Sequence, residues 1–409
     1  MSKKTFYIIL IFLIIGGGIA FLFYYLYGRT PSGGISTTQN NDNLFPFDNS
    51  GTPSGGSGDQ TNVNTGSFGT SNSPVPKLRK LSENPLAGQT GFLRDKKVFF
   101  RFIERATGHI SESPADAMIT DKVTNTTIPK IYEALWTKDG GGSLLRYLKD
   151  DEETIVSFYA SIGKASTGTP ASLTGTFLTQ NIDTAVVSPD RKTIAFVLPS
   201  LFGATLYTAD AVTLKPKGVF NTALREWNVS WPEKNTIVLT SKASANVEGF
   251  VYAISLPSGS AKKILGGQKG LTANLSANGK QLLFSSNKRN NVSLKILDLK
   301  TNREISLPFN TLPEKCVWSQ KTVTLVYCAV PKSSLEQNLP DEWYKGGVSF
   351  DDDLWAFDSL TGSTLHPLDP STYKQSFDIT DLSFDPTEQY ILFTNKKDLT
   401  GWAYRLIEN

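Results

Sequence analysis

The chain has 409 residues, a formal net charge of +3, 19% charged and 11% aromatic residues, and only two histidines and two cysteines. A charge this close to zero, without clustered basic residues, excludes the basic face on which nucleic-acid-binding proteins depend. Two histidines and two cysteines are too few for a multi-ligand zinc or iron–sulfur site. The composition therefore predicts a globular body with no metal, no cofactor and no nucleic-acid partner.

The first element is an uncharged apolar run, TFYIILIFLIIGGGIAFLFYYLY, at residues 5–27. A transmembrane helix needs about 20 such residues, whereas a cleaved signal peptide has a shorter apolar run that ends in a small-x-small site. We therefore expect a retained helix that contacts the lipid bilayer. Lys3 and Lys4 precede the run and Arg29 follows it, which predicts a cytoplasmic N-terminus (1–4) and an extracytoplasmic location for the rest of the chain.

Residues 28–76 consist mostly of Gly, Ser, Thr, Asn and Pro. Such a segment buries too little apolar surface to offset the entropy lost on ordering it. We expect a disordered linker that acts as a spacer. Its few apolar side chains, such as Phe45 and Phe47, leave a short docking motif as the alternative.

From residue 77 onward one pattern returns, an alternating apolar strand, a polar turn and a second apolar strand. Its best copies are AVVSPDRKTIAFV at 185–197, NVSWPEKNTIVLT at 228–240 and ANLSANGKQLLFS at 273–285. The turns begin at Phe92, Thr137, Ser188, Trp231, Ser276, Ser319 and Asp385, at intervals of 45, 51, 43, 45, 43 and 66 residues. Hairpins at a period of about 40–50 residues, several followed by two further strands, are typical of a β-propeller.

The two ends of this region predict how the ring closes. After the last hairpin one more strand fits, at 402–407, so that blade lacks a fourth strand. The segment KLRKL at 77–81 has the character of an outer strand and stands before the first hairpin. Pairing these two segments would cap an open edge. We therefore predict an all-β fold, a seven-bladed β-propeller over 77–409 whose seventh blade is built from both ends.

The turns SPDRKTIAF and SANGKQLLF resemble the WD40-like repeat of the TolB type, in which S-P-D-G-K precedes an apolar strand. The resemblance covers essentially all of 77–409 and implies a propeller. The order of membrane helix, polar linker and propeller also resembles membrane-anchored surface propeller proteins of small-genome bacteria. Pro-Asp becomes Pro-Glu at 232–233 and Ala-Asn at 277–278. Because the motif is turn chemistry, these departures alter no functional expectation.

Cys316 and Cys328 are placed symmetrically about the turn at 321–323. In a hairpin they face one another on adjacent strands, and outside the cytoplasm such a pair forms a structural disulfide. Two reduced, buried cysteines are the alternative. The spacing does not fit a redox-active C-x-x-C motif.

The longest interval holds an insertion at about 333–352, SSLEQNLPDEWYKGGVSFDD. Loops on a rigid scaffold often carry recognition residues, and exposed Trp and Tyr are enriched at interfaces. Trp343 and Tyr344 are therefore the candidate binding residues. A loop folded onto its own blade is the alternative.

Two further features resemble functional sites without matching them. Asp351–Asp353 lacks the alternating ligands and the glycine of a calcium loop, so we expect solvated charges at the entry to a strand. His109 and His366 each stand alone between turn residues, which indicates surface histidines. No catalytic residue is predicted.

These features favour a non-enzymatic protein-interaction module of the cell envelope, bound to an envelope protein. A carbohydrate- or cell-wall-binding propeller is the first alternative. A hydrolase with its site in the central funnel is the second, because sequence spacing leaves open whether Asp, Glu and Arg side chains converge there. No G-x-S-x-G motif occurs in the sequence, so a peptidase of the prolyl-peptidase type is not expected.

Overall fold

The computed structural model describes residues 75–163, 170–288, 291–335 and 338–406. The cytoplasmic tail and membrane helix predicted at 1–4 and 5–27, and nearly all of the linker predicted at 28–76, lie outside these ranges. Within the part of the chain that is described, no helix combines the length and the apolar content needed to cross a bilayer.

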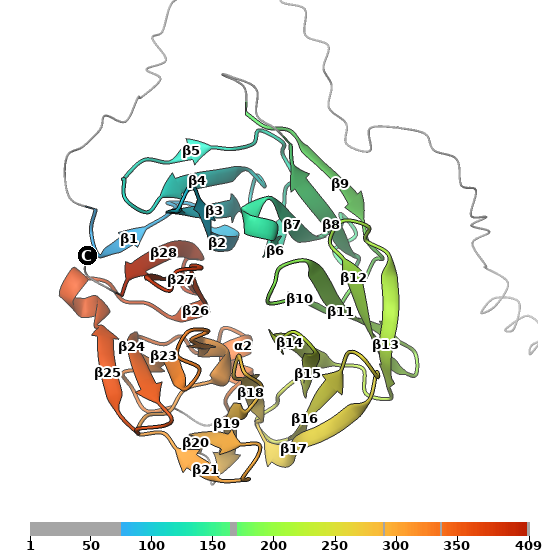
Figure 1. Cartoon of the computed structure of the whole chain (residues 1–409), viewed down its shortest axis with the longest axis vertical. Coiled ribbons are helices and arrows are strands. Elements are labelled where there is room, and N and C mark those ends of the chain that lie inside the picture. The colour runs from blue at the N-terminus through green and yellow to red at the C-terminus, as the bar shows by residue number, and fades with distance from the viewer. Residues whose placement is uncertain (1–74, 164–169, 289–290, 336–337, 407–409) are drawn as a thin grey trace, which may run out of the picture. The chain divides into compact units, whose positions relative to one another are not determined.

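The described strands form seven four-stranded sheets arranged around a common centre (Figure 1). We call each sheet a blade and number the blades 1 to 7 in the order given below. Neighbouring strands within each blade are antiparallel, and in blades 1 to 6 they are also consecutive in the chain. Figure 1 places β2, β6, β10, β14, β18 and β26 nearest the centre, so each hairpin predicted from the sequence forms the two inner strands of a blade. The predicted seven-bladed, all-β propeller is confirmed.

Blades 1 to 3 follow in chain order. Blade 1 contains β2 (Leu86–Arg94), β3 (Lys97–Glu104), β4 (Ile110–Pro114) and β5 (Asp121–Lys122). Blade 2 contains β6 (Ile131–Thr137), β7 (Gly142–Leu148), β8 (Ile155–Ile162) and β9 (Leu173–Phe177), with a 3-10 turn, η1 (Lys138–Gly140), between its inner strands. Blade 3 contains β10 (Thr184–Val187), β11 (Thr193–Ser200), β12 (Gly203–Asp210) and β13 (Pro216–Thr222).

Blades 4 to 6 repeat the arrangement. Blade 4 contains β14 (Trp227–Glu233), β15 (Thr236–Ser241), β16 (Glu248–Ser255) and β17 (Ala261–Lys269). Blade 5 contains β18 (Thr272–Leu275), β19 (Gln281–Lys288), β20 (Asn291–Asp298) and β21 (Glu304–Ser306). Blade 6 follows η2 (Pro313–Lys315) and contains β22 (Cys316–Trp318), β23 (Leu325–Pro331), β24 (Asp352–Asp358) and β25 (Thr364–Leu368), with the short helix α2 (Asp341–Tyr344) between β23 and β24.

Blade 7 follows η3 (Pro370–Tyr373) and closes the ring. It contains β26 (Ile379–Phe384), β27 (Tyr390–Asn395), β28 (Thr400–Arg405) and, as its outer strand, β1 (Leu78–Lys80). Leu78 lies opposite Tyr404, which confirms the predicted pairing of the two ends. The buried Arg79 side chain also donates hydrogen bonds to the carbonyls of Pro114 (3.1 Å) and Ala117 (2.9 Å), so β1 ties blade 7 to blade 1.

The apolar core lies between neighbouring blades. Ile103 of blade 1 packs with Trp136 of blade 2, and Val197 of blade 3 packs with Leu239 of blade 4. Because each blade is covered on both faces, the second strand of a blade is apolar on both sides. The side chains eight residues after each turn start are buried at Phe100, Leu145, Phe196, Leu239, Phe284 and Phe393, and half-buried at Tyr327.

The S-P-D turn shows why the repeat needs its polar residues. The Ser188 hydroxyl donates to the Asp190 carboxylate at 2.7 Å and accepts from the backbone N–H of Thr193 at 3.0 Å. Arg191 occupies the left-handed position, with φ 56°, where the motif has glycine. Its guanidinium donates to the Thr90 hydroxyl of blade 1 at 2.8 Å, which links two blades that are not neighbours.

Candidate functional site

A pocket of about 870 Å³ lies where the inner strands of blades 2 to 5 converge. These strands contribute Glu133, Thr184, Asn228 and Asn274 to its wall. Glu314 of η2 and the insertion residues Asp341 and Tyr344 complete it, and we call it the central pocket. Figure 1 shows α2 near the middle of the ring, beside β14 and β18. The insertion of blade 6 therefore reaches the inner ends of blades 4 and 5, where it hydrogen-bonds to Ala245 and Asn287, and it shapes this pocket.

Trp343 fixes the insertion to the ring. Its side chain is only 5% exposed and packs with Leu339 and Phe350 in a small cluster of its own. The indole N–H donates to both carboxylate oxygens of Asp378, at 3.1 and 3.0 Å. The structure therefore places Trp343 in the anchor of the insertion, turned away from solvent.

Tyr344 lies at the central pocket and is 42% exposed. Its hydroxyl donates a hydrogen bond of 2.6 Å to Glu314, and the Asn228 amide lies 3.5 Å from the same carboxylate oxygen. Burial among the protein atoms around the pocket raises the pKa of the Glu314 carboxyl, and burial together with the Glu314 charge raises the pKa of Tyr344. Of the two candidate binding residues, Tyr344 therefore faces the pocket, whereas Trp343 is buried and does not.

A buried ionic cluster supports this edge of the pocket. The Lys315 ammonium lies 2.8 Å from Asp352 and 2.6 Å from Asp378, and all three side chains are fully buried. The centres of the Trp343 and Phe350 rings each lie 5.0 Å from the Lys315 nitrogen. A buried cation needs such compensation because desolvation penalises an unpaired charge heavily.

The expectation of solvated charges at Asp351–Asp353 is wrong. Asp352 is fully buried against Lys315 and accepts the backbone N–H of Ile379 at 2.7 Å. Asp353 lies 3.2 Å from Lys332 and 3.3 Å from the His366 ring nitrogen. Local sequence does not reveal this burial, because the residues that compensate the charges come from other segments of the chain.

The two histidines lie outside the central pocket. His366 stacks on Trp355 with ring centres 4.2 Å apart. His109 lies 3.2 Å from the Thr127 hydroxyl, and burial together with the Lys122 charge lowers its pKa. Among the described residues, no group of three His, Cys, Asp or Glu side chains has a metal-binding arrangement.

Cys316 and Cys328 form a disulfide across the inner hairpin of blade 6. They are directly opposite one another in the β22–β23 register, as the symmetric spacing predicts. Both are buried in the core that blades 5 and 6 share. This disulfide is structural, and neither cysteine lines the central pocket, although the Cys316 carbonyl accepts a hydrogen bond of 2.9 Å from the pocket residue Asn274.

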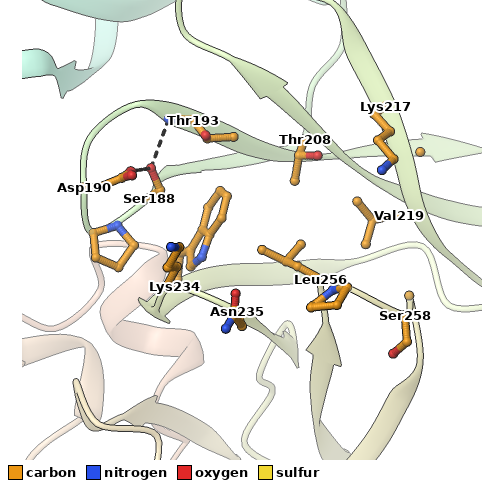
Figure 2. A pocket seen from close by; sticks show the side chains of 15 residues that line it. Ser188, Asp190, Thr193, Thr208, Lys217, Val219, Lys234, Asn235, Leu256 and Ser258 are labelled. Carbon is orange, nitrogen blue, oxygen red and sulfur yellow. Dashed lines mark hydrogen bonds between the residues drawn. The ribbon is translucent and has the colours of Figure 1, made fainter.

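A second pocket, of about 700 Å³, lies between blades 3 and 4 beside the S-P-D turn (Figure 2). Figure 2 shows Lys217 and Lys234 on opposite sides of it, with Thr208, Asn235 and Ser258 also on its wall. Trp231 also lines this pocket, and its indole N–H has no hydrogen-bond partner among the described residues. The pocket therefore offers several hydrogen-bond donors beside an aromatic ring.

Comparisons with known proteins identify the class to which this fold belongs. No family model and no curated protein sequence matches the chain. The β-propeller domain of the Trilobed protease from Pyrococcus furiosus is similar at 12% identity and a TM-score of 0.50, over 79% of this chain and 95% of that one. TolB from Acinetobacter baumannii is 17% identical over 66% of this chain and 63% of its own, with a TM-score of 0.41.

The tricorn protease is 11% identical over 81% of this chain and 34% of its own, with a TM-score of 0.49. At these identities the likeness concerns the fold alone. With its seven closed blades, the protein is a β-propeller, and its S-P-D turn resembles the WD40-like repeat of the TolB type. The Trilobed protease shows that a propeller of this fold also occurs as a domain of an enzyme.

Proposed function

We propose that the protein is a membrane-anchored, extracytoplasmic propeller that acts as a non-enzymatic interaction module of the cell envelope and binds an envelope protein at the central pocket. One observation supports the central pocket as the binding site. The buried contacts of Trp343 with Asp378 hold the insertion in place, while Tyr344, the next residue, is 42% exposed at the pocket. An exposed Tyr on a firmly anchored element has the properties of an interface hot spot.

The sequence supports the proposed location. The apolar run at 5–27 has the length of a membrane helix, and Lys3 and Lys4 precede it. The Cys316–Cys328 disulfide is a bond that persists in oxidising compartments. Deletion of 5–27 should release the protein from the membrane fraction. In intact spheroplasts that contain the full-length protein, protease added from outside should digest the propeller. A protected propeller would contradict the orientation.

Site-specific photo-crosslinking tests the partner. A photoreactive phenylalanine analogue replaces Tyr344 in the full-length protein, and the control carries it at Leu360, which is 79% exposed in the β24–β25 turn. We expect irradiation of cells to yield one discrete envelope-protein adduct from position 344 and not from position 360. Equal adducts from both positions, or none from 344 under any growth condition, would reject the proposal.

Carbohydrate binding is a second candidate, and the pocket between blades 3 and 4 favours it. Sugars bind through many hydrogen bonds beside an aromatic ring, and Trp231, Asn235 and Ser258 supply both there. A glycan array with the full-length protein tests it, with a Lys217→Ala/Lys234→Ala variant as comparison. If the wild-type protein binds a defined glycan and the variant does not, sugar binding at this pocket is supported. If the wild-type protein binds no glycan on the array, this candidate function is rejected.

A further inference from the structure

We propose that the central pocket receives a lysine or arginine side chain of the partner protein, and that apolar side chains of the same partner segment cover an exposed apolar rim beside it. The apolar rim consists of Leu201, Phe202, Leu224 and Val247. This inference rests on the proposed function and names the chemistry of the partner.

The pocket holds more negative charge than its own cations neutralise. Lys242, a cation on its wall, lies 2.8 Å from Asp183 and is already paired. Glu133 is likewise paired, with Arg146. Glu226 lines the same pocket and is exposed, and its carboxylate forms no hydrogen bond or ion pair with a described residue; only its backbone carbonyl is bonded, to the N–H of Lys242. The central pocket therefore has an unpaired carboxylate that a cationic side chain of a partner could neutralise.

Glu314 adds a second carboxylate without an ion-pair partner. Its hydrogen-bond partners are the neutral groups of Tyr344 and Asn228. Burial raises the pKa of the Glu314 carboxyl. The Lys396 charge offsets part of this burial effect but forms no ion pair with Glu314, because its ammonium donates to the Trp343 carbonyl and lies 4.2 Å from the centre of the Trp343 ring. The ionised form of Glu314 is therefore undercompensated in the unbound protein. A bound cation would supply the compensation.

The apolar rim lies at the same end of the ring. Leu201 and Phe202 form the β11–β12 turn and are 84% and 90% exposed. The next residue, Gly203, lies against the backbone of Thr222 and Ala223, so this turn adjoins Leu224, two residues before the pocket residue Glu226. Blades 3 and 4 thus present apolar side chains next to the negative pocket.

Val247, in the β15–β16 loop of blade 4, extends the rim next to another residue of the pocket. It is 62% exposed, and its backbone N–H bonds to the carbonyl of Ser244, which lines the pocket. Exposed apolar groups beside an uncompensated charge favour a protein segment over a free amine, because such a segment buries the rim and pairs the charge together. The complementary occupant is a basic and apolar stretch of the partner.

The experiment selects 12-residue peptides from a random displayed library on the full-length protein and then measures their affinity by fluorescence anisotropy. We expect the selected peptides to share a Lys or Arg next to Leu or Phe. Replacing that basic residue with norleucine should weaken binding about tenfold or more, since a charge-assisted contact is lost. Affinity should also fall as salt is raised.

Matched variants locate the contact. Glu226→Gln and Glu314→Gln should each weaken the selected peptide about tenfold, and Phe202→Ser should weaken it as well. The control is Asp116→Asn, which removes one negative charge in the β4–β5 turn, where Asp116 is 59% exposed. It should leave affinity unchanged, and all variants should show wild-type melting temperatures.

Two outcomes overturn the inference. One is a selection that gives no binders, or binders without a basic residue. The other is unchanged affinity in both the Glu226→Gln and Glu314→Gln variants. If the adduct from position 344 still forms in cells in either case, the proposed function stands and only the basic partner is rejected. If the adduct is missing while a basic peptide binds the pocket, the envelope partner is rejected instead.

Discussion

Lys315 and Asp352 form an ion pair of 2.8 Å although neither side chain is exposed to solvent. Lys315 ends η2 before blade 6, and Asp352 opens β24 at the end of the insertion. Asp378, at the entry to blade 7, lies 2.6 Å from the same ammonium and also accepts the indole N–H of Trp343. This cluster therefore joins two blades and the insertion at the edge of the central pocket.

Replacement of Lys315 by Met should destabilise the propeller by about 3–5 kcal/mol, because it leaves two buried carboxylates without their cation. Equilibrium unfolding in urea measures the change. The control is Lys332→Met, since Lys332 is partly exposed in its contacts with Asp353 and Asp369. A surface pair of that kind contributes about 1 kcal/mol or less. Equal effects of the two substitutions would contradict the role assigned to the cluster.

Asp352 should make stability depend on pH. Burial, partly offset by Lys315, raises its pKa from 3.8 to about 6. The folded protein therefore holds this proton more tightly than the unfolded chain, so the contribution of Asp352 to stability falls as pH rises from about 4 to about 6. The stability of the wild type relative to Asp352→Asn should decline over this window and stay constant above it. A difference that does not vary with pH would contradict the assignment.

Loss of the Cys316–Cys328 disulfide should lower stability by roughly 3 kcal/mol, because the bond closes a short loop in the unfolded chain. Unfolding of the Cys316→Ala/Cys328→Ala variant against the oxidised wild type measures this loss. Reduction of the wild type should produce a similar change and expose two titratable thiols. Free thiols in the untreated protein would show that the bond is not formed.

Ring closure depends on β1. Leu78 is buried with Trp402 and Tyr404, so Leu78→Asp should prevent β1 from docking and leave the edge of β28 open. We expect a lower melting temperature and self-association, seen by calorimetry and by light scattering after size exclusion. Lys80→Gln, at a partly exposed position of the same strand, should remain monodisperse. Deletion of 77–82 that left a stable, monodisperse protein would disprove closure by both ends.

Much of the fold was predictable because it depends on local pattern. The turns at Ser188 and Ser276 show their polar chemistry in consecutive residues, and the apolar side chain eight residues later marks the buried second strand. The symmetric spacing of Cys316 and Cys328 likewise predicts the register in which they pair. The last strand begins at Thr400, two residues before the predicted start at 402, because strand ends depend on pairing with neighbouring strands.

The candidate site was predictable only in part. The insertion stood out as an irregular interval, and its two aromatic residues were the natural candidates. The structure distinguishes the two residues, since Trp343 is buried within the insertion and Tyr344 is exposed at the pocket. Glu226 and Glu314 were missed because nothing in their local sequence distinguishes them from ordinary surface carboxylates.

The sequence alone determined the number of blades, their hairpins, the closing strand and the cysteine pair, because each of these is recorded in spacing along the chain. Only the tertiary structure decided which side chains meet at the centre. Glu133 and Asn228 come from blades 2 and 4, whereas Glu314 belongs to η2 and Tyr344 to the insertion of blade 6. Their proximity follows from the closure of the ring, which brings together residues that are distant in sequence and carry no local sign of one another.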